Sequence, residues 1–102
     1  MGEAIARSPD IEPAHPGELL NEIVIPATGL SKSEVARRLG ISRQTLYDVL
    51  AGRQPVTPMV ALRLGRLFGD GGRVWLRMQA EHDLWHAERR LDISTIDPLR
   101  AA

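Results

Sequence analysis

Apolar residues recur along this chain at helical spacing, in short runs that prolines and glycines separate. We expect a first helix over residues 16–25. Proline fits the first turn of a helix, as at Pro16, but not a helix interior, so Pro26 is expected to end it. The apolar stripe of this helix has i, i+3 and i+4 spacing and consists of Leu19, Leu20, Ile23 and Val24.

The stretch LSKSEVARRLGISRQTLYDVLAGR contains two helix patterns joined by a glycine. Ser31 and Glu34 form the S-x-x-E pattern of a capping box, and Gly40 is expected to end this helix in a left-handed cap. Ser42 is a second N-cap, and its helix is expected to run to about Ala51. The side chains expected to face inward are Val35, Ala36, Leu39, Leu46, Val49 and Leu50.

Two more helices are expected in the second half of the chain. Thr57 and Pro58 are an N-cap followed by proline at the first helical position, which predicts a helix over residues 58–68. A longer helix is expected from about residue 72 to Leu91. No segment alternates with period two, so the fold class is all-α with five helices. The expected division is a flexible N-terminal arm at 1–14, a helical domain at 15–91 and a frayed tail at 92–102.

The joint between the second and third helices is only three residues long, which is typical of a helix-turn-helix. Ala36 is small where the two helix axes approach, Gly40 can adopt a positive φ, and Ile41 can fill the corner. The inward residues leave a polar set facing outward at the start of the third helix, namely Arg43, Gln44, Tyr47 and Asp48. A plain corner between two helices with a solvated face is the alternative, and the combined spacing favours the helix-turn-helix.

A recognition helix reads base edges with its N-terminal residues. Arginine pairs bidentately with guanine and glutamine with adenine, and the free N–H groups of a helix start hold phosphates. The charge distribution agrees with DNA binding, although the formal net charge is zero. Residues 31–66 carry seven basic and two acidic side chains, a net charge of +5, so the remainder carries −5. Such segregation indicates one face for a polyanion or an acidic partner.

Composition narrows the remaining classes of function. The chain has no cysteine, which excludes disulfides and thiolate metal ligands. It shows neither an apolar run of membrane-spanning length nor an export signal, so we expect a cytoplasmic protein without a membrane partner. No glycine-rich phosphate loop or nucleophile triad is visible, and we expect no enzyme activity and no cofactor.

One motif resembles a metal site. His82, Asp83 and His86 match H-D-x-x-H, which is close to the zinc-protease pattern H-E-x-x-H. Two histidines at i, i+4 share a helix face, but aspartate is one methylene shorter than the glutamate base and no third ligand follows downstream. We therefore expect no catalytic metal, and the motif leaves open whether it ever binds one.

Four segments together resemble one family. HPGELLNE, the helix-turn-helix stretch quoted above, VTPMVALRLGRLFG and VWLRMQAEHDLW are similar to the HigA antitoxins, within the lambda-repressor-like helix-turn-helix group. The resemblance covers about residues 15–90 and departs at Gly71-Gly72, where the family more often has a Pro-Glu-Phe type start. The last helix is therefore expected to begin late or to be less firmly fixed.

The resemblance implies a dimeric repressor of its own operon, which binds palindromic operator DNA and silences a HigB-like, RelE-like mRNA-cleaving toxin. By position it places Arg43, Gln44 and Tyr47 on base-facing sites and Ser42 and Thr45 on phosphate contacts. Arg53 in the following loop and Lys32 in the basic segment complete the expected DNA-binding set. A stand-alone helix-turn-helix regulator without a toxin, or an interaction module that no longer binds DNA, is the alternative.

Two protein interfaces are expected outside this set. The last helix is apolar over more than one face, so part of it is expected to form a two-fold dimer through Trp75, Met78, Leu84 and Trp85, although both tryptophans fit a core equally. The first 22 residues carry five acidic side chains and one arginine, so the toxin is expected on Glu12, Glu18 and Glu22.

Overall fold

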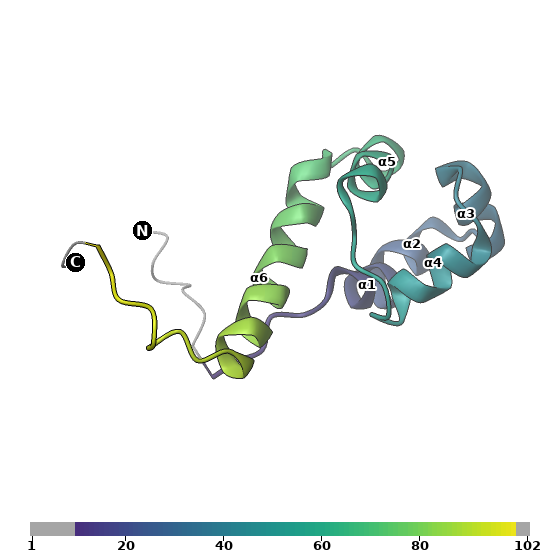
Figure 1. Ribbon diagram of the computed structural model, residues 1–102. Coiled ribbons are helices and arrows are strands. Elements are labelled where there is room, and N and C mark those ends of the chain that lie inside the picture. The colour runs from purple at the N-terminus through teal and green to yellow at the C-terminus, as the bar shows by residue number, and fades with distance from the viewer. Residues whose placement is uncertain (1–9, 100–102) are drawn as a thin grey trace, which may run out of the picture.

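The computed structural model describes residues 10–99, and within that range it contains helices and no strand (Figure 1). The elements are α1 (Pro16–Leu19), η2 (Leu20–Val24), α2 (Ile25–Thr28), α3 (Lys32–Leu39), α4 (Arg43–Leu50), α5 (Pro58–Phe68) and α6 (Gly72–Arg90). Because α1, η2 and α2 follow one another without a break, they form one helical run, and the five-helix, all-α prediction is confirmed. Residues 1–9 of the expected arm and 100–102 of the expected tail lie outside the described range.

The first helical run continues past Pro26, which corrects its predicted end at residue 25. Here η2 is a π-helical turn, in which the N–H of Ile25 bonds to the carbonyl of Leu20 five residues earlier. The wider turn makes room for the proline ring, so the helix goes on to Thr28. It also rotates the apolar stripe by one residue: Ile25 is 3% exposed, whereas Ile23, which was wrongly predicted to face inward, is 61% exposed.

The two caps of the helix-turn-helix form as predicted. Ser31 Oγ accepts a hydrogen bond from the N–H of Glu34 at 3.1 Å, and Ser42 Oγ accepts one from the N–H of Thr45 at 3.0 Å. Gly40 ends α3 with a φ of 74°, a left-handed conformation that glycine adopts without steric cost. The Glu34 carboxylate bonds to arginines of its own helix, so only the serine half of the capping box forms.

One core joins the helices. Its buried apolar side chains come from every helix and from the segment before α5, and are Leu20, Ile25, Val35, Ala36, Leu39, Leu46, Val49, Leu50, Val56, Val60, Ala61, Leu64 and Trp75. The inward residues predicted for α3 and α4 are thereby confirmed. No helix of the described part is both long and apolar enough to cross a membrane.

The buried core holds the last helix only through its first half. Its buried residues are Trp75 and Gln79, and no residue after them is buried. Gln79 Oε1 accepts the N–H of Val56 at 2.7 Å, and its Nε2 donates to Asp83 at 3.0 Å, so the buried amide is satisfied at both ends. Gln79 could not be recognised as buried from the sequence, because a glutamine at a helical position is more often exposed.

Glycines set the distance between α5 and α6. A Cβ on Gly65 would lie 2.3 Å from the carbonyl carbon of Gly71, so only glycine allows this approach. Helix α6 begins at Gly72 without a side-chain cap. The Gly71-Gly72 pair, where the sequence departs from the family pattern, therefore lies at a close contact between α5 and α6. Helix α6 does not begin late.

The first helix makes a second close approach, to α4. A Cβ on Gly17 would lie 1.9 Å from the carbonyl oxygen of Val49. His15 caps this helix by accepting the N–H of Gly17 on Nδ1 at 2.9 Å. Burial, and then the neighbouring His82, lower the pKa of His15 below its ordinary 6.5. The cap requires a neutral His15 ring. Its contribution to the stability of the fold is therefore fully present above pH 6.5 and is lost as the pH falls through the lowered pKa of the folded state.

Candidate nucleic-acid interface

The turn between α3 and α4 is held by a backbone hydrogen bond of its own and by a side chain of the neighbouring helix α5. The N–H of Ile41 bonds to the carbonyl of Ala36 at 3.1 Å, which closes the end of α3. Arg63 of α5 donates from Nη1 to the carbonyl of Leu39 at 2.8 Å, where the C-terminal carbonyls of α3 attract a cation. In the sequence, Arg63 counted only toward the net positive charge of residues 31–66. Its hydrogen bond from α5 to the end of α3 depends on how the two helices pack.

The start of α4 presents its polar residues outward, as the sequence predicted. Arg43 and Gln44 are exposed, and Tyr47 remains 39% exposed. Ser42 and Thr45 lie beside them: Ser42 Oγ donates to Thr45 Oγ1 at 2.8 Å while it caps the helix. The structure therefore gathers the residues predicted to contact bases and those predicted to contact phosphates at the same helix start.

Asp48 organises this surface. Its Oδ1 accepts hydrogen bonds from Gln44 Nε2 at 2.9 Å and from Arg53 Nη2 at 3.0 Å. The backbone of Arg53 also donates to the carbonyl of Asp48 at 2.8 Å. The i, i+4 spacing of Gln44 and Asp48 was a signal for the first pair, whereas the second depends on the turn after α4. Asp48 thus holds the side chains of Gln44 and Arg53 together.

A groove beside α4 collects four of the predicted DNA-binding residues. Its lining side chains come from the first helical run, α3, α4 and the loop after it, and are Asn21, Lys32, Gln44, Tyr47, Leu50, Ala51 and Arg53. Lys32 Nζ lies 5.8 Å from the centre of the Tyr47 ring, within the range of a cation–π contact. Asn21 lies in a different helix, so its place in this groove could not be predicted from the sequence. Arg43 instead reaches across the turn to Ser33 Oγ at 3.4 Å.

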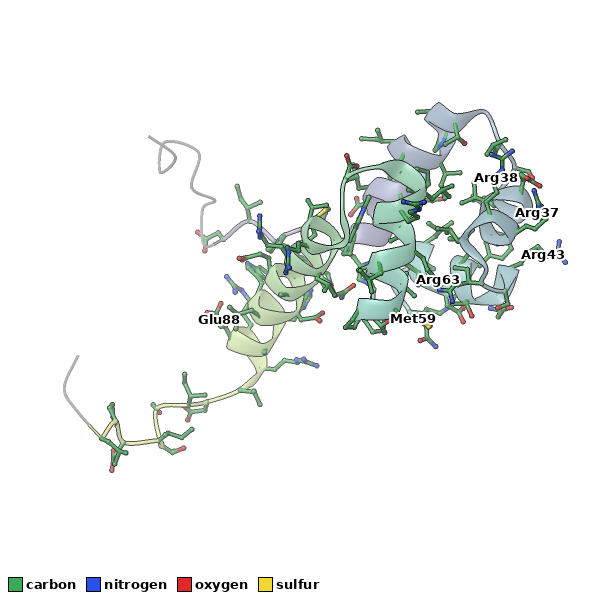
Figure 2. All side chains as sticks on the ribbon, turned by 90° about the horizontal axis from the view of Figure 1, so that it is seen from above. Arg37, Arg38, Arg43, Met59, Arg63 and Glu88 are labelled. Atoms are coloured by element: carbon green, nitrogen blue, oxygen red, sulfur yellow. The ribbon has the colours of Figure 1, made fainter. Side chains whose placement is uncertain are left out.

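The basic side chains concentrate at the helix-turn-helix end of the molecule. Figure 2 shows Arg37, Arg38 and Arg43 at this end, away from Glu88 on α6. Arg37 and then Arg38 donate hydrogen bonds to Glu34 and lower its pKa to about 2, so this carboxylate stays ionised at physiological pH. The ion pairs are exposed and hold the arginines in place rather than stabilise the fold appreciably.

The residues predicted for protein interfaces lie in different surroundings. Trp75 is 2% exposed and belongs to the core, which corrects its assignment to a dimer surface. Met78 packs partly against that core, whereas Leu84 is 57% exposed. The Trp85 ring is half-buried and carries the Arg89 guanidinium 3.6 Å from its centre. Only part of the predicted stripe is therefore available to a partner.

The acidic residues predicted for the toxin do not form one free patch. Glu18 and Glu22 are exposed on α1 and η2. Glu12 precedes the helix, and its carboxylate lies 2.5 Å from His86 Nε2 on α6. Glu3 and Arg7, which contributed to the predicted charge of the arm, lie outside the described residues.

Comparison with known proteins places this interface in a family. A model of helix-turn-helix domains matches residues 26–73. Virulence-associated protein I of Dichelobacter nodosus is 37% identical over 86 residues, which are 83% of this chain and 80% of that protein. The solved structure of a HigA-family addiction module antidote protein from Coxiella burnetii is 31% identical, covers 78% of this chain and 87% of its own, and has a TM-score of 0.73. The chain belongs to the HigA-like family of helix-turn-helix antitoxins.

A second HigA-like structure was solved with DNA. The antitoxin HigA of Pseudomonas aeruginosa with the higBA promoter is 28% identical to this chain, covers 87% of it and all of its own length, and has a TM-score of 0.75. The coverage extends well beyond the helix-turn-helix, so the HigA-like resemblance seen in the sequence and the lambda-repressor-like fold are confirmed.

Proposed function

We propose that this HigA-like chain is the antitoxin of a type II toxin–antitoxin pair. As a homodimer it binds a palindromic operator and represses its own operon, and it also binds and neutralises a RelE-like, mRNA-cleaving toxin. The observation that carries the DNA-binding half is the exposed start of α4, where Asp48 holds Gln44 and Arg53 at one groove. The solved complex of the Pseudomonas aeruginosa HigA with the higBA promoter supports DNA binding by a protein of this fold.

The proposed contacts divide by chemistry. Gln44 offers an amide donor and acceptor, which pair bidentately with adenine once its bond to Asp48 opens. Arg43 and Tyr47 flank it on the base-facing side. Ser42, Thr45 and the free N–H groups of the α4 start hold phosphates, as do Lys32 and Arg53 at the groove edges. Phosphate contacts fix the position on DNA, and base contacts supply the specificity.

The operator prediction uses Gln44→Ala and Arg53→Ala. The first removes a base contact and is expected to weaken binding to the preferred site by about 1–3 kcal/mol, with little change on unrelated DNA. The second removes a phosphate contact and is expected to weaken all sequences alike and to lower the slope of log K against log salt by about one. Fluorescence anisotropy with operator and unrelated duplexes, at several salt concentrations, measures both.

Unrelated duplex of equal length is the control for nonspecific attraction. Equal operator affinity for wild type and Gln44→Ala would remove Gln44 from the interface. A wild type that does not distinguish its own promoter from unrelated DNA would instead support an interaction module that has lost DNA binding.

The dimer is proposed to form through exposed apolar residues of α6. Helix-turn-helix dimers place two recognition helices about 34 Å apart, so that they enter successive major grooves on one side of the duplex. The two-fold interface must leave α4 free, and α6 lies at the opposite end of the molecule (Figure 1). Leu84 provides the exposed apolar side chain there.

The toxin surface is proposed on the outer face of the first helical run, where Glu18 and Glu22 are exposed. A toxin that holds mRNA needs a basic surface, and opposite charge speeds the encounter of the two proteins. Glu12 belongs to the same acidic segment, but its carboxylate is already engaged with His86. This surface lies on a different helix from the proposed DNA-binding residues of α4, so the toxin and the operator are proposed to bind separate surfaces.

Reversing Glu18 and Glu22 to lysine is expected to weaken binding of the cognate toxin by about tenfold or more, because attraction becomes repulsion. Operator affinity is expected not to fall, because added positive charge favours DNA binding. Calorimetry with the toxin encoded next to this gene measures the effect. The matched control reverses Glu81 and Glu88 on α6, with the same change in net charge.

Equal weakening by both pairs would show that overall charge, and not this surface, governs toxin binding. Unchanged affinity in the first pair would place the contact elsewhere. If no neighbouring gene encodes a small toxin, the stand-alone regulator is the correct reading.

A further inference from the structure

Two histidines of α6 have no part in the proposed DNA or toxin contacts. His82 and His86 lie one turn apart, with ring centres separated by 4.5 Å. No third ligand follows the H-D-x-x-H motif downstream in the sequence. The fold supplies one from upstream: Glu12, 74 residues before His86, reaches the same place.

The three side chains converge closely. Glu12 Oε2 lies 2.5 Å from His86 Nε2 and 3.9 Å from His82 Nδ1. One ligand atom from each residue can be chosen so that all three lie within 4.8 Å of one another. Ligand atoms around a tetrahedral zinc ion, with bonds of about 2.0–2.2 Å, are roughly 3.3 Å apart. The two observed separations, 2.5 Å and 3.9 Å, lie on either side of that spacing.

The backbone holds this arrangement independently of the Glu12 side chain. His82 Nδ1 lies 2.8 Å from the carbonyl oxygen of Pro13, which is buried against the helix. The same Nδ1 is the His82 nitrogen that lies 3.9 Å from Glu12 Oε2, so metal binding through Nδ1 replaces its bond to Pro13. The neighbouring His15 is already used, because its Nδ1 caps α1.

We propose that Glu12, His82 and His86 bind one zinc ion, which fastens the segment before α1 to α6. Two imidazoles and a carboxylate are a donor set that zinc accepts with a fourth position left for water. Hard cations such as Mg²⁺ prefer oxygen ligands and are expected to bind poorly. The ion acts as a structural link, because α6 has no buried residue after Gln79.

The surroundings fit a solvated, non-catalytic site. A hollow lined by His82, Asp83, His86 and Arg90 opens beside the three ligands and gives water access. Asp83 already accepts a hydrogen bond from Gln79, so it is not a free base for activating water. The carboxylates of Glu12 and Asp83 outnumber the positive charge of Arg90, which leaves the site net attractive for a cation.

The test uses the full-length protein without a histidine tag, freed of metal by a chelating resin. Titration with ZnCl₂ in a non-coordinating buffer is expected to give one ion per chain, and Mg²⁺ no saturable binding. Glu12→Gln and His86→Ala are each expected to weaken zinc binding by about tenfold or more, since even outer-shell changes cost that much. Glu88→Gln neutralises an exposed carboxylate on the same helix and is expected to bind zinc like wild type.

A second measurement separates binding at this site from loss of fold. Zinc is expected to raise the melting temperature of wild type and Glu88→Gln, but not of Glu12→Gln, because only a ligand of the native state stabilises it. Glu12→Gln changes one exposed carboxylate to an amide, and circular dichroism checks that its helix content is retained. Absence of saturable zinc binding in wild type, or equal zinc affinity in wild type and Glu12→Gln, would overturn the proposal.

Discussion

Replacing Leu84 by arginine is expected to make the protein monomeric and to weaken operator binding by about 10²–10⁴-fold, because a dimer gains this much from binding two half-sites at once. Leu84 is 57% exposed on the half of α6 that the core does not hold. An arginine at this position would place one unpaired charge from each subunit in an apolar two-fold interface, and both charges would have to lose their water. Sedimentation and operator titration measure the two effects.

Ile23→Arg is the matched control for this change. Ile23 is 61% exposed, but it lies in η2 and outside the proposed dimer surface, so this variant is expected to remain dimeric. The added positive charge would favour DNA binding, so a fall in operator affinity for Leu84→Arg cannot come from charge alone. A Leu84→Arg protein that sediments as a dimer would show that the subunits meet through another surface.

Gly17→Ala is expected to destabilise the protein by about 3 kcal/mol, which corresponds to a fall in melting temperature of roughly 15 °C for a domain of this size. Within a helix, alanine is normally better than glycine by about 1 kcal/mol. Here its Cβ would lie 1.9 Å from the carbonyl oxygen of Val49, and the obstacle is backbone, which cannot rotate away. The first helix would have to move off α4.

Gly29→Ala is the comparison that isolates this clash. Gly29 ends the same helical run with a φ of 72° and has open space around its Cβ position, so alanine there is expected to cost only the left-handed conformation, about 1–2 kcal/mol. Thermal unfolding followed by circular dichroism ranks the two variants. A smaller loss for Gly17→Ala than for Gly29→Ala would mean that α1 and α4 can separate at little cost.

The sequence by itself determined the ends of α3 and α4, the two helices of the helix-turn-helix. Ser31 and Ser42 each bond to an N–H three residues further on, and Gly40 adopts its left-handed angle locally. Such interactions join neighbours in the chain, so the residue types and their spacing suffice to predict them. The outward polar start of α4 follows in the same way, because the apolar residues of one helix fix which side faces the core.

The tertiary structure decided everything that joins distant parts of the chain. The π-helical turn shifted the buried stripe from Ile23 to Ile25, and helix packing placed Trp75 in the core. The convergence of Glu12 with His86 depends on how the segment before α1 crosses α6, 74 residues later. Spacing along the sequence carries no information about such meetings, because they are set by the angles and distances at which the finished helices pack.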